Sequence, residues 1–80
     1  MGEDVDKLRK TLSHNIKKYR AEMGFSQEKL AEIVGLSVQT INDVEGCRNW
    51  VSDKTLVKIA HALKVEAFQL LYPGSEKEKQ

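Results

Sequence analysis

The feature that most constrains this chain is a window of 20 residues, from Gln27 to Gly46, in which apolar residues recur at fixed offsets. Small or apolar residues occupy the fourth, fifth, eighth, tenth, fifteenth and eighteenth places: Leu30, Ala31, Val34, Leu36, Ile41 and Val44. Gly35 stands at the ninth place, where a tight turn between two helices needs a left-handed residue, which glycine adopts without a Cβ penalty. The window therefore predicts a helix-turn-helix motif, and the alternative is an ordinary helical hairpin with a glycine stop.

The remaining residues also have the spacing of short helices. A first apolar stripe advances in steps of three or four residues: Leu8, Leu12, Ile16, Tyr19 and Met23. This helix is expected to begin at an Asp4 or Asp6 cap and to stop at Gly24. Three further helical stripes each follow a serine that is expected to be the N-cap: Ser26, Ser37 and Ser52. A short fifth helix is expected at residues 66–71. The sequence therefore predicts an all-α domain of five helices, with the helix-turn-helix formed by helices two and three.

Length and composition exclude several classes of protein. A chain of 80 residues has room for one small domain and little room for a deep catalytic pocket. No apolar run approaches the roughly 20 residues of a membrane-spanning helix, so no membrane association is expected. The single cysteine, Cys47, cannot form an internal disulfide, which favours a cytoplasmic location. His14 and His61 lie on different expected helices, so we expect no metal site. The sequence contains no Ser/His/Asp set and no glycine loop that could hold a phosphate, so we expect no cofactor and no catalytic residues.

The charge is unevenly distributed along the chain. The formal net charge is +1, yet residues 7–20 carry six basic residues and no acidic one, while residues 1–6 carry three acidic residues. A local concentration of basic side chains favours nucleic-acid binding more than the total charge does. The alternative is that this segment is a solvated helix face.

Residues from about 16 to 71 resemble the Cro/cI-type (XRE-family) helix-turn-helix domain, which has the lambda-repressor-like five-helix fold. The matching segments are Ile16-Lys-Lys-Tyr-Arg20, Gly24-Phe-Ser-Gln-Glu28, Leu30-Ala31, Gly35-Leu36-Ser37, Ile41-Asn-Asp-Val-Glu45-Gly46 and Leu56-Val-Lys-Ile-Ala60 with Ala62-Leu63. The resemblance implies a transcription regulator that binds operator DNA as a homodimer. The expected organisation is an N-terminal arm at residues 1–6, the domain at residues 7–73 and a disordered polar tail at residues 74–80.

Two positions depart from the family pattern. The proline that usually follows the recognition helix is absent, and the chain reads Cys47-Arg48-Asn49-Trp50-Val51. We expect Trp50 to pack into the core, with a place on the DNA side as the alternative. Lys64 stands where the family tends to have glycine at the end of helix four, so a left-handed lysine is expected there.

Helical geometry selects the side chains of helix three that could read bases. If Ile41 and Val44 point inward, Gln39 points outward, with Val38 and Asp43 beside it. Glutamine suits adenine, valine can contact the thymine methyl group and a carboxylate can accept from cytosine N4. Ser37 and Thr40 at the helix start could bond to bases or phosphates. The alternative is that this face is merely solvated.

Further residues are expected to hold the DNA backbone or the fold. Gln27 begins helix two, where its side chain and backbone N–H could meet a phosphate. Lys17 and Arg48 are candidate phosphate contacts. The resemblance implies an ion pair between Arg20 and Glu45.

Apolar residues near the C-terminal end predict a dimer interface. Phe68, Leu71 and Tyr72 lie close together, while Val65 and Leu70 are expected to point inward. The function that the sequence favours is sequence-specific binding of double-stranded DNA by a transcriptional regulator, acting as a repressor. The alternative is a protein-interaction module, such as an antitoxin that binds a partner toxin.

Overall fold

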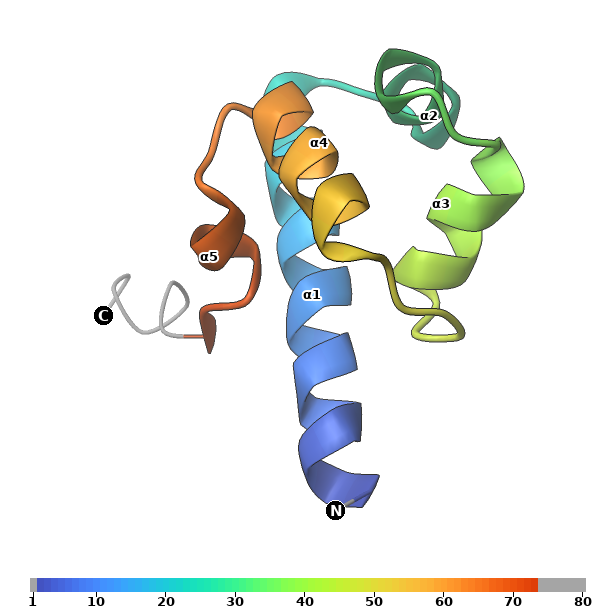
Figure 1. The fold of residues 1–80 in the computed structure, drawn as a ribbon. Coiled ribbons are helices and arrows are strands. Elements are labelled where there is room, and N and C mark those ends of the chain that lie inside the picture. The colour runs from blue at the N-terminus through green and yellow to red at the C-terminus, as the bar shows by residue number, and fades with distance from the viewer. Residues whose placement is uncertain (1, 74–80) are drawn as a thin grey trace.

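A computed structural model describes residues 2–73, which form five α-helices and contain no strand. The helices are α1 (Gly2–Met23), α2 (Gln27–Val34), α3 (Val38–Glu45), α4 (Asp53–Leu63) and α5 (Ala67–Leu70). The long α1 runs up the middle of the view in Figure 1, with α5 on one side and α2 and α3 on the other, and the other helices gather around its C-terminal half. The predicted all-α, five-helix fold is therefore confirmed.

Short polar residues define the beginnings of the three central helices. The Ser26 hydroxyl accepts a hydrogen bond from the backbone N–H of Lys29, and Ser37 and Ser52 serve as caps in the same way. Gly35 ends α2 with a left-handed backbone at φ 77°, as the turn between the two helices requires. Lys64 is also left-handed, at φ 62°, so the expected conformation at the end of α4 is confirmed.

The core lies where α1, α2, α3, α4 and α5 meet. Every helix contributes at least one side chain that is almost completely excluded from solvent. The buried apolar residues are Leu12, Ile16, Leu30, Ala31, Val34, Ile41, Val44, Val51, Ile59, Ala60, Leu63 and Leu70. The six apolar positions that defined the helix-turn-helix window all lie in this core or against it.

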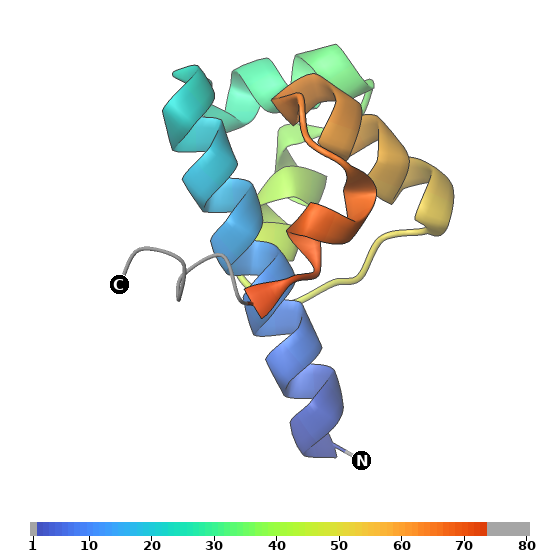
Figure 2. The same cartoon turned by 90° about the vertical axis from the view of Figure 1, so that its left-hand side faces the viewer.

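The start of α1 differs from the expectation. The helix begins at Gly2 rather than at an Asp4 or Asp6 cap, so residues 2–6, which were expected to form an N-terminal arm, are helical. Glu3 and Asp4 lie in the first turn, where carboxylates interact favourably with the positive end of the helix dipole. These turns extend beyond the other helices in both views (Figures 1 and 2), which leaves Leu8 exposed rather than in the core. The tail expected at residues 74–80 lies outside the described residues.

The segment between α3 and α4 corrects the expectation that Trp50 packs into the core. Trp50 is 40% exposed, and Val51 is buried in its place, since only one of these neighbours can point into the core before α4 begins. The left-handed residue after α3 is Cys47, at φ 64°, whereas Gly46 has a negative φ. A Cβ at Gly46 would overlap the guanidinium group of Arg48, so that this flexible side chain would have to shift.

The last helix is attached to the first by a buried amide. The Asn15 side chain donates to the carbonyl of Leu70 at 2.9 Å and to those of Gln69 and Tyr72 at 3.2 Å. Asn15 is 1% exposed, so its bonds to α5 form in the interior. This residue was not singled out in the sequence, because one asparagine within an otherwise apolar stripe carries no distinctive spacing.

Candidate nucleic-acid interface

The orientation of α3 is set by its buried side. Ile41 and Val44 are 1% and 2% exposed and anchor the helix to the core. Gln39 lies on the opposite side, Val38 lies beside it, and both side chains are exposed. The two sides of one short helix thus combine a buried contact with the core and an accessible outer face.

The outer face of α3 is organised by Asp43. Its carboxylate accepts from the Gln39 amide at 2.9 Å and from the Arg48 Nε at 3.1 Å. The bond between Gln39 and Asp43 restrains the Gln39 amide but leaves its oxygen and its second N–H available. A bidentate contact with adenine uses this oxygen and an N–H of the same amide. Arg48 compensates the Asp43 charge, which would otherwise repel a phosphate.

Arg48 is held against the C-terminal end of α3. In addition to its bond with Asp43, its Nη2 donates to the Asn42 side chain at 2.7 Å and to the Asn42 carbonyl at 3.2 Å. The guanidinium group occupies the space that the missing side chain of Gly46 leaves open. The side chain is nevertheless 57% exposed, so a phosphate can approach it from solvent.

Glu45 joins three helices at the inner edge of this face. Its carboxylate accepts from Arg20 of α1, with Nε–Oε2 at 2.8 Å and Nη2–Oε1 at 3.0 Å. It also accepts from the Gln27 amide of α2 at 2.9 Å. The Glu45 side chain is 4% exposed, and the Arg20 side chain is 20% exposed. The result is a largely buried ion pair that fixes the angle between α3 and its neighbours.

Gln27 belongs to the same network. Its side-chain oxygen accepts from the Asn42 amide at 3.3 Å, so the residue bridges Glu45 and Asn42. Sequence reasoning did not assign a role to Asn42, because helical geometry alone shows an exposed residue and not its partners. These two bonds fix the orientation of the Gln27 amide.

Three residues expected to contact phosphate lie around one hollow beside α3. This pocket has a volume of about 350 Å³ and includes Lys17, Gln27 and Arg48; its other lining residues are Arg20, Asn42, Glu45 and Gly46. Lys17 and Arg48 bring positive charge to it, and Gln27 brings an amide. Such a lining suits an anionic oxygen, as in a DNA backbone.

Ser37 and Thr40 are engaged at the start of α3. The Ser37 hydroxyl accepts from the Thr40 backbone N–H at 3.1 Å, and the two hydroxyls are 2.9 Å apart. Both side chains therefore stabilise the beginning of the helix. The Ser37 side chain is exposed, and the Thr40 side chain is half-buried.

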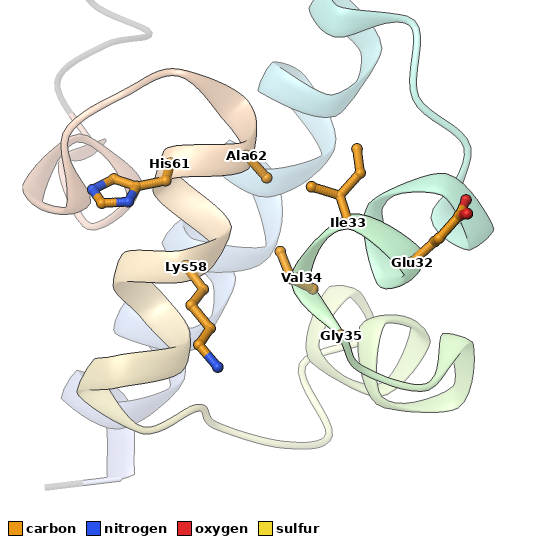
Figure 3. Close-up of a pocket in the computed structure, with 7 residues that line it drawn as sticks. All are labelled: Glu32, Ile33, Val34, Gly35, Lys58, His61 and Ala62. Carbon is orange, nitrogen blue, oxygen red and sulfur yellow. The ribbon is translucent and has the colours of Figure 1, made fainter.

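A second hollow lies away from this face. It has a volume of about 550 Å³ and is lined entirely by the C-terminal part of α2, its cap and α4 (Figure 3). Ile33, Val34 and Ala62 give it an apolar side, and Lys58 and His61 lie along α4. Within residues 2–73, no three metal-ligating side chains gather at one place, and no helix has the length and hydropathy to cross a membrane.

Comparison with known proteins identifies the family of this domain. Residues 16–70 match the model of the HTH_3 helix-turn-helix family. A hypothetical transcription factor from Neisseria meningitidis is 38% identical over 76 residues, covering 95% of this chain and 72% of that protein. The crystal structure of a hypothetical transcription factor from Neisseria matches with a TM-score of 0.83 at 39% identity, covering 90% of this chain and 83% of that chain.

Two controller proteins are also similar. Control protein C.SmaI from Serratia marcescens is 38% identical over 64 residues, covering 80% of this chain and 76% of that protein. The crystal structure of the restriction-modification controller protein C.AhdI from Aeromonas hydrophila has a TM-score of 0.73 at 31% identity, covering 85% of this chain and 97% of that chain. The chain belongs to the HTH_3 (XRE-type) helix-turn-helix family, a family of DNA-binding regulators rather than of enzymes.

Proposed function

We propose that this chain is a transcriptional regulator that binds double-stranded operator DNA, places α3 in the major groove and acts as a repressor in the cytoplasm. The observation that carries the proposal is the outer face of α3, where an exposed Gln39 amide is oriented by Asp43. The family assignment supports the same function, because relatives of similar length carry the description of transcription factor or controller protein. The proposal includes no catalytic activity.

The residues divide into two groups by their surroundings. Gln39 and Val38 face outward and would read bases, with Asp43, Ser37 and Thr40 beside them. Lys17, Gln27 and Arg48 line the polar hollow and would contact the phosphate backbone. Base contacts carry sequence information, whereas phosphate contacts set position and orientation.

The proposal includes a homodimer that uses the exposed side of α5. Phe68 is 69% exposed and Tyr72 is 51% exposed, whereas Leu71 packs partly against the core. A two-fold dimer would place two copies of α3 about 34 Å apart, so the operator would be a near-palindrome with half-sites one helical turn apart. In this arrangement Phe68 and Tyr72 would provide most of the contact.

The test compares Gln39→Ala with Gln27→Ala on an operator selected from random DNA. Gln39→Ala should weaken operator binding by about 1–3 kcal/mol and relax the preference at one base pair, with little effect on a scrambled duplex. Gln27→Ala should weaken binding to both duplexes, because a phosphate contact is independent of sequence. The measurement is a titration of each variant against both duplexes at one salt concentration.

Thermal melting of both variants serves as the control for folding. Equal losses on the two duplexes for Gln39→Ala would show that this side chain is a backbone anchor and not a base reader. If the parent chain binds neither duplex but binds a protein partner, the proposal of DNA binding is wrong and the chain is a protein-interaction module.

A further inference from the structure

The Gln39 amide on the outer face of α3 is held with a fixed polarity. Its Nε2 donates to Asp43 Oδ1 at 2.9 Å, one helical turn further along the chain. A carboxylate accepts hydrogen bonds and does not donate them, so the opposite orientation would place the Gln39 oxygen against a carboxylate oxygen. The nitrogen and the oxygen of this amide are therefore not interchangeable, whereas an exposed glutamine without such a partner can turn over.

The Asp43 carboxylate is itself held by Arg48. The Arg48 Nε donates to the same Oδ1 at 3.1 Å, and the Arg48 backbone N–H donates to the Asp43 carbonyl at 2.8 Å. The left-handed backbone of Cys47, with φ 64°, turns the chain back toward α3 between these two residues. Hydrogen bonds between charged groups are stronger than those between neutral groups, so Arg48 keeps the carboxylate beside Gln39.

The held amide matches adenine and does not match guanine. In the major groove adenine presents the N7 acceptor beside the N6 donor, whereas guanine presents two acceptors, N7 and O6. With one N–H bound to Asp43, Gln39 has one N–H and its oxygen left for a base, which is the complement of adenine. Against guanine the same oxygen would face O6, and neither atom carries a proton. A glutamine that can turn over can instead direct both N–H groups of Nε2 at the two acceptors of guanine.

We infer that Asp43 is a specificity-determining residue, which excludes guanine from the base pair that Gln39 contacts by holding the Gln39 amide in one orientation. The inference rests on the proposed function, because it concerns the same DNA site. It gives Asp43 a positioning role, in which the residue acts on the base through Gln39 and not by direct contact. Discrimination of this kind comes from an unfavourable contact with the wrong base as well as from a favourable contact with the right one.

The experiment measures the preference for adenine at one base pair. In an operator selected from random DNA, the base pair that Gln39 contacts is the one at which Gln39→Ala relaxes the preference. Affinities are then measured for two duplexes that differ only there, with A·T or G·C. The parent should prefer adenine by about tenfold or more, as expected for one good bidentate contact. Asp43→Asn should reduce this ratio to about twofold or less, because asparagine can also donate to the Gln39 oxygen and so lets the amide turn over.

A double variant tests whether Asp43 acts through Gln39. In a Gln39→Ala background, Asp43→Asn should leave the ratio between the two duplexes unchanged. A change that persists in this background would show that Asp43 contacts the base pair itself, for example at cytosine N4, and would overturn the inference.

Glu32→Gln is the matched control for charge. It removes the same negative charge from an exposed position on α2, so any change in affinity should be equal on the two duplexes. Asp43→Ala, in which no group holds the amide, should reproduce the ratio of Asp43→Asn, and thermal melting establishes that each variant is folded.

Two further outcomes separate this inference from the proposed function. If the parent binds the operator but both Asp43 variants keep its full preference for adenine, or if the parent prefers guanine at this base pair, the inference is wrong and the proposed function stands. A parent that binds no duplex would overturn both.

Discussion

At the scale of single residues, the Glu45 carboxylate joins three helices. A carboxylate removed from water is costly unless it is paired and hydrogen-bonded. Here two bonds from Arg20 and one from Gln27 supply that compensation. Because the three residues belong to α1, α2 and α3, the charge network also sets the angle at which the outer face of α3 is presented.

Glu45→Ala should lower the free energy of unfolding by about 3 kcal/mol, because it leaves the Arg20 guanidinium without its partner. This estimate takes the low end of the range for buried pairs, since Arg20 retains 20% of its exposure. The measurement is urea denaturation followed by circular dichroism. Glu22→Ala, an exposed site on α1, is the matched control and should change stability little. Equal stabilities of the two variants would contradict a stabilising role for the pair.

The exposure of residues at the site could be predicted from the sequence, but their contacts could not. The exposure of Val38 and Gln39 followed from the helical period once Ile41 and Val44 were assigned to the core. The bonds of Asn42 to Gln27 and Arg48 could not be predicted, because they depend on how α2 and α3 are placed side by side. Trp50 and Val51 are both apolar neighbours in a loop, where no period indicates which one faces inward.

At the scale of helices, the boundaries with a local chemical cause were predictable. Ser26, Ser37 and Ser52 stand at the starts of α2, α3 and α4 because their hydroxyls satisfy a backbone N–H that the helix leaves unpaired. The start of α1 was not predictable in this way. Three acids suit a helix N-terminus at several registers, so the helix extends to Gly2 without a single distinguishing cap.

The end of α4 gives a test of backbone strain. Lys64→Gly should raise the free energy of unfolding by about 1 kcal/mol, because a left-handed conformation costs roughly 1–2 kcal/mol for residues with a Cβ. Lys58→Gly provides the matched control, since the same replacement inside α4 should destabilise by about 1 kcal/mol. Thermal denaturation of both variants gives the comparison. A loss of stability in Lys64→Gly would indicate that the lysine side chain stabilises the fold by more than its left-handed backbone destabilises it.

At the scale of the whole molecule, the two proposed interfaces lie on different elements. The DNA face is built on α3 with support from α1 and α2, whereas the dimer surface is built on α5. The α5 helix is four residues long and is attached to α1 through Asn15. The relative position of two DNA faces in a dimer would therefore depend on the packing of α5 against α1.

Phe68→Glu should convert a dimer into a monomer, because it places a charge at the centre of the exposed α5 surface. Sedimentation at moderate salt measures the mass, and a titration measures binding to a two-half-site operator. We expect at least a tenfold loss of affinity for that operator and little change on a single half-site. Val57→Glu, also an exposed apolar residue, should behave like the parent. The dimer proposal fails if Phe68→Glu and the parent have the same mass while both remain folded.

The exposed position of Trp50 has a practical consequence. It is the only tryptophan of the chain, and it lies two residues beyond Arg48 in the segment that connects α3 to α4. An indole ring that retains 40% of its exposure emits light in a partly aqueous environment. Any ligand that covers this segment changes that environment, so the unlabelled protein carries its own fluorescent reporter in the segment that follows α3.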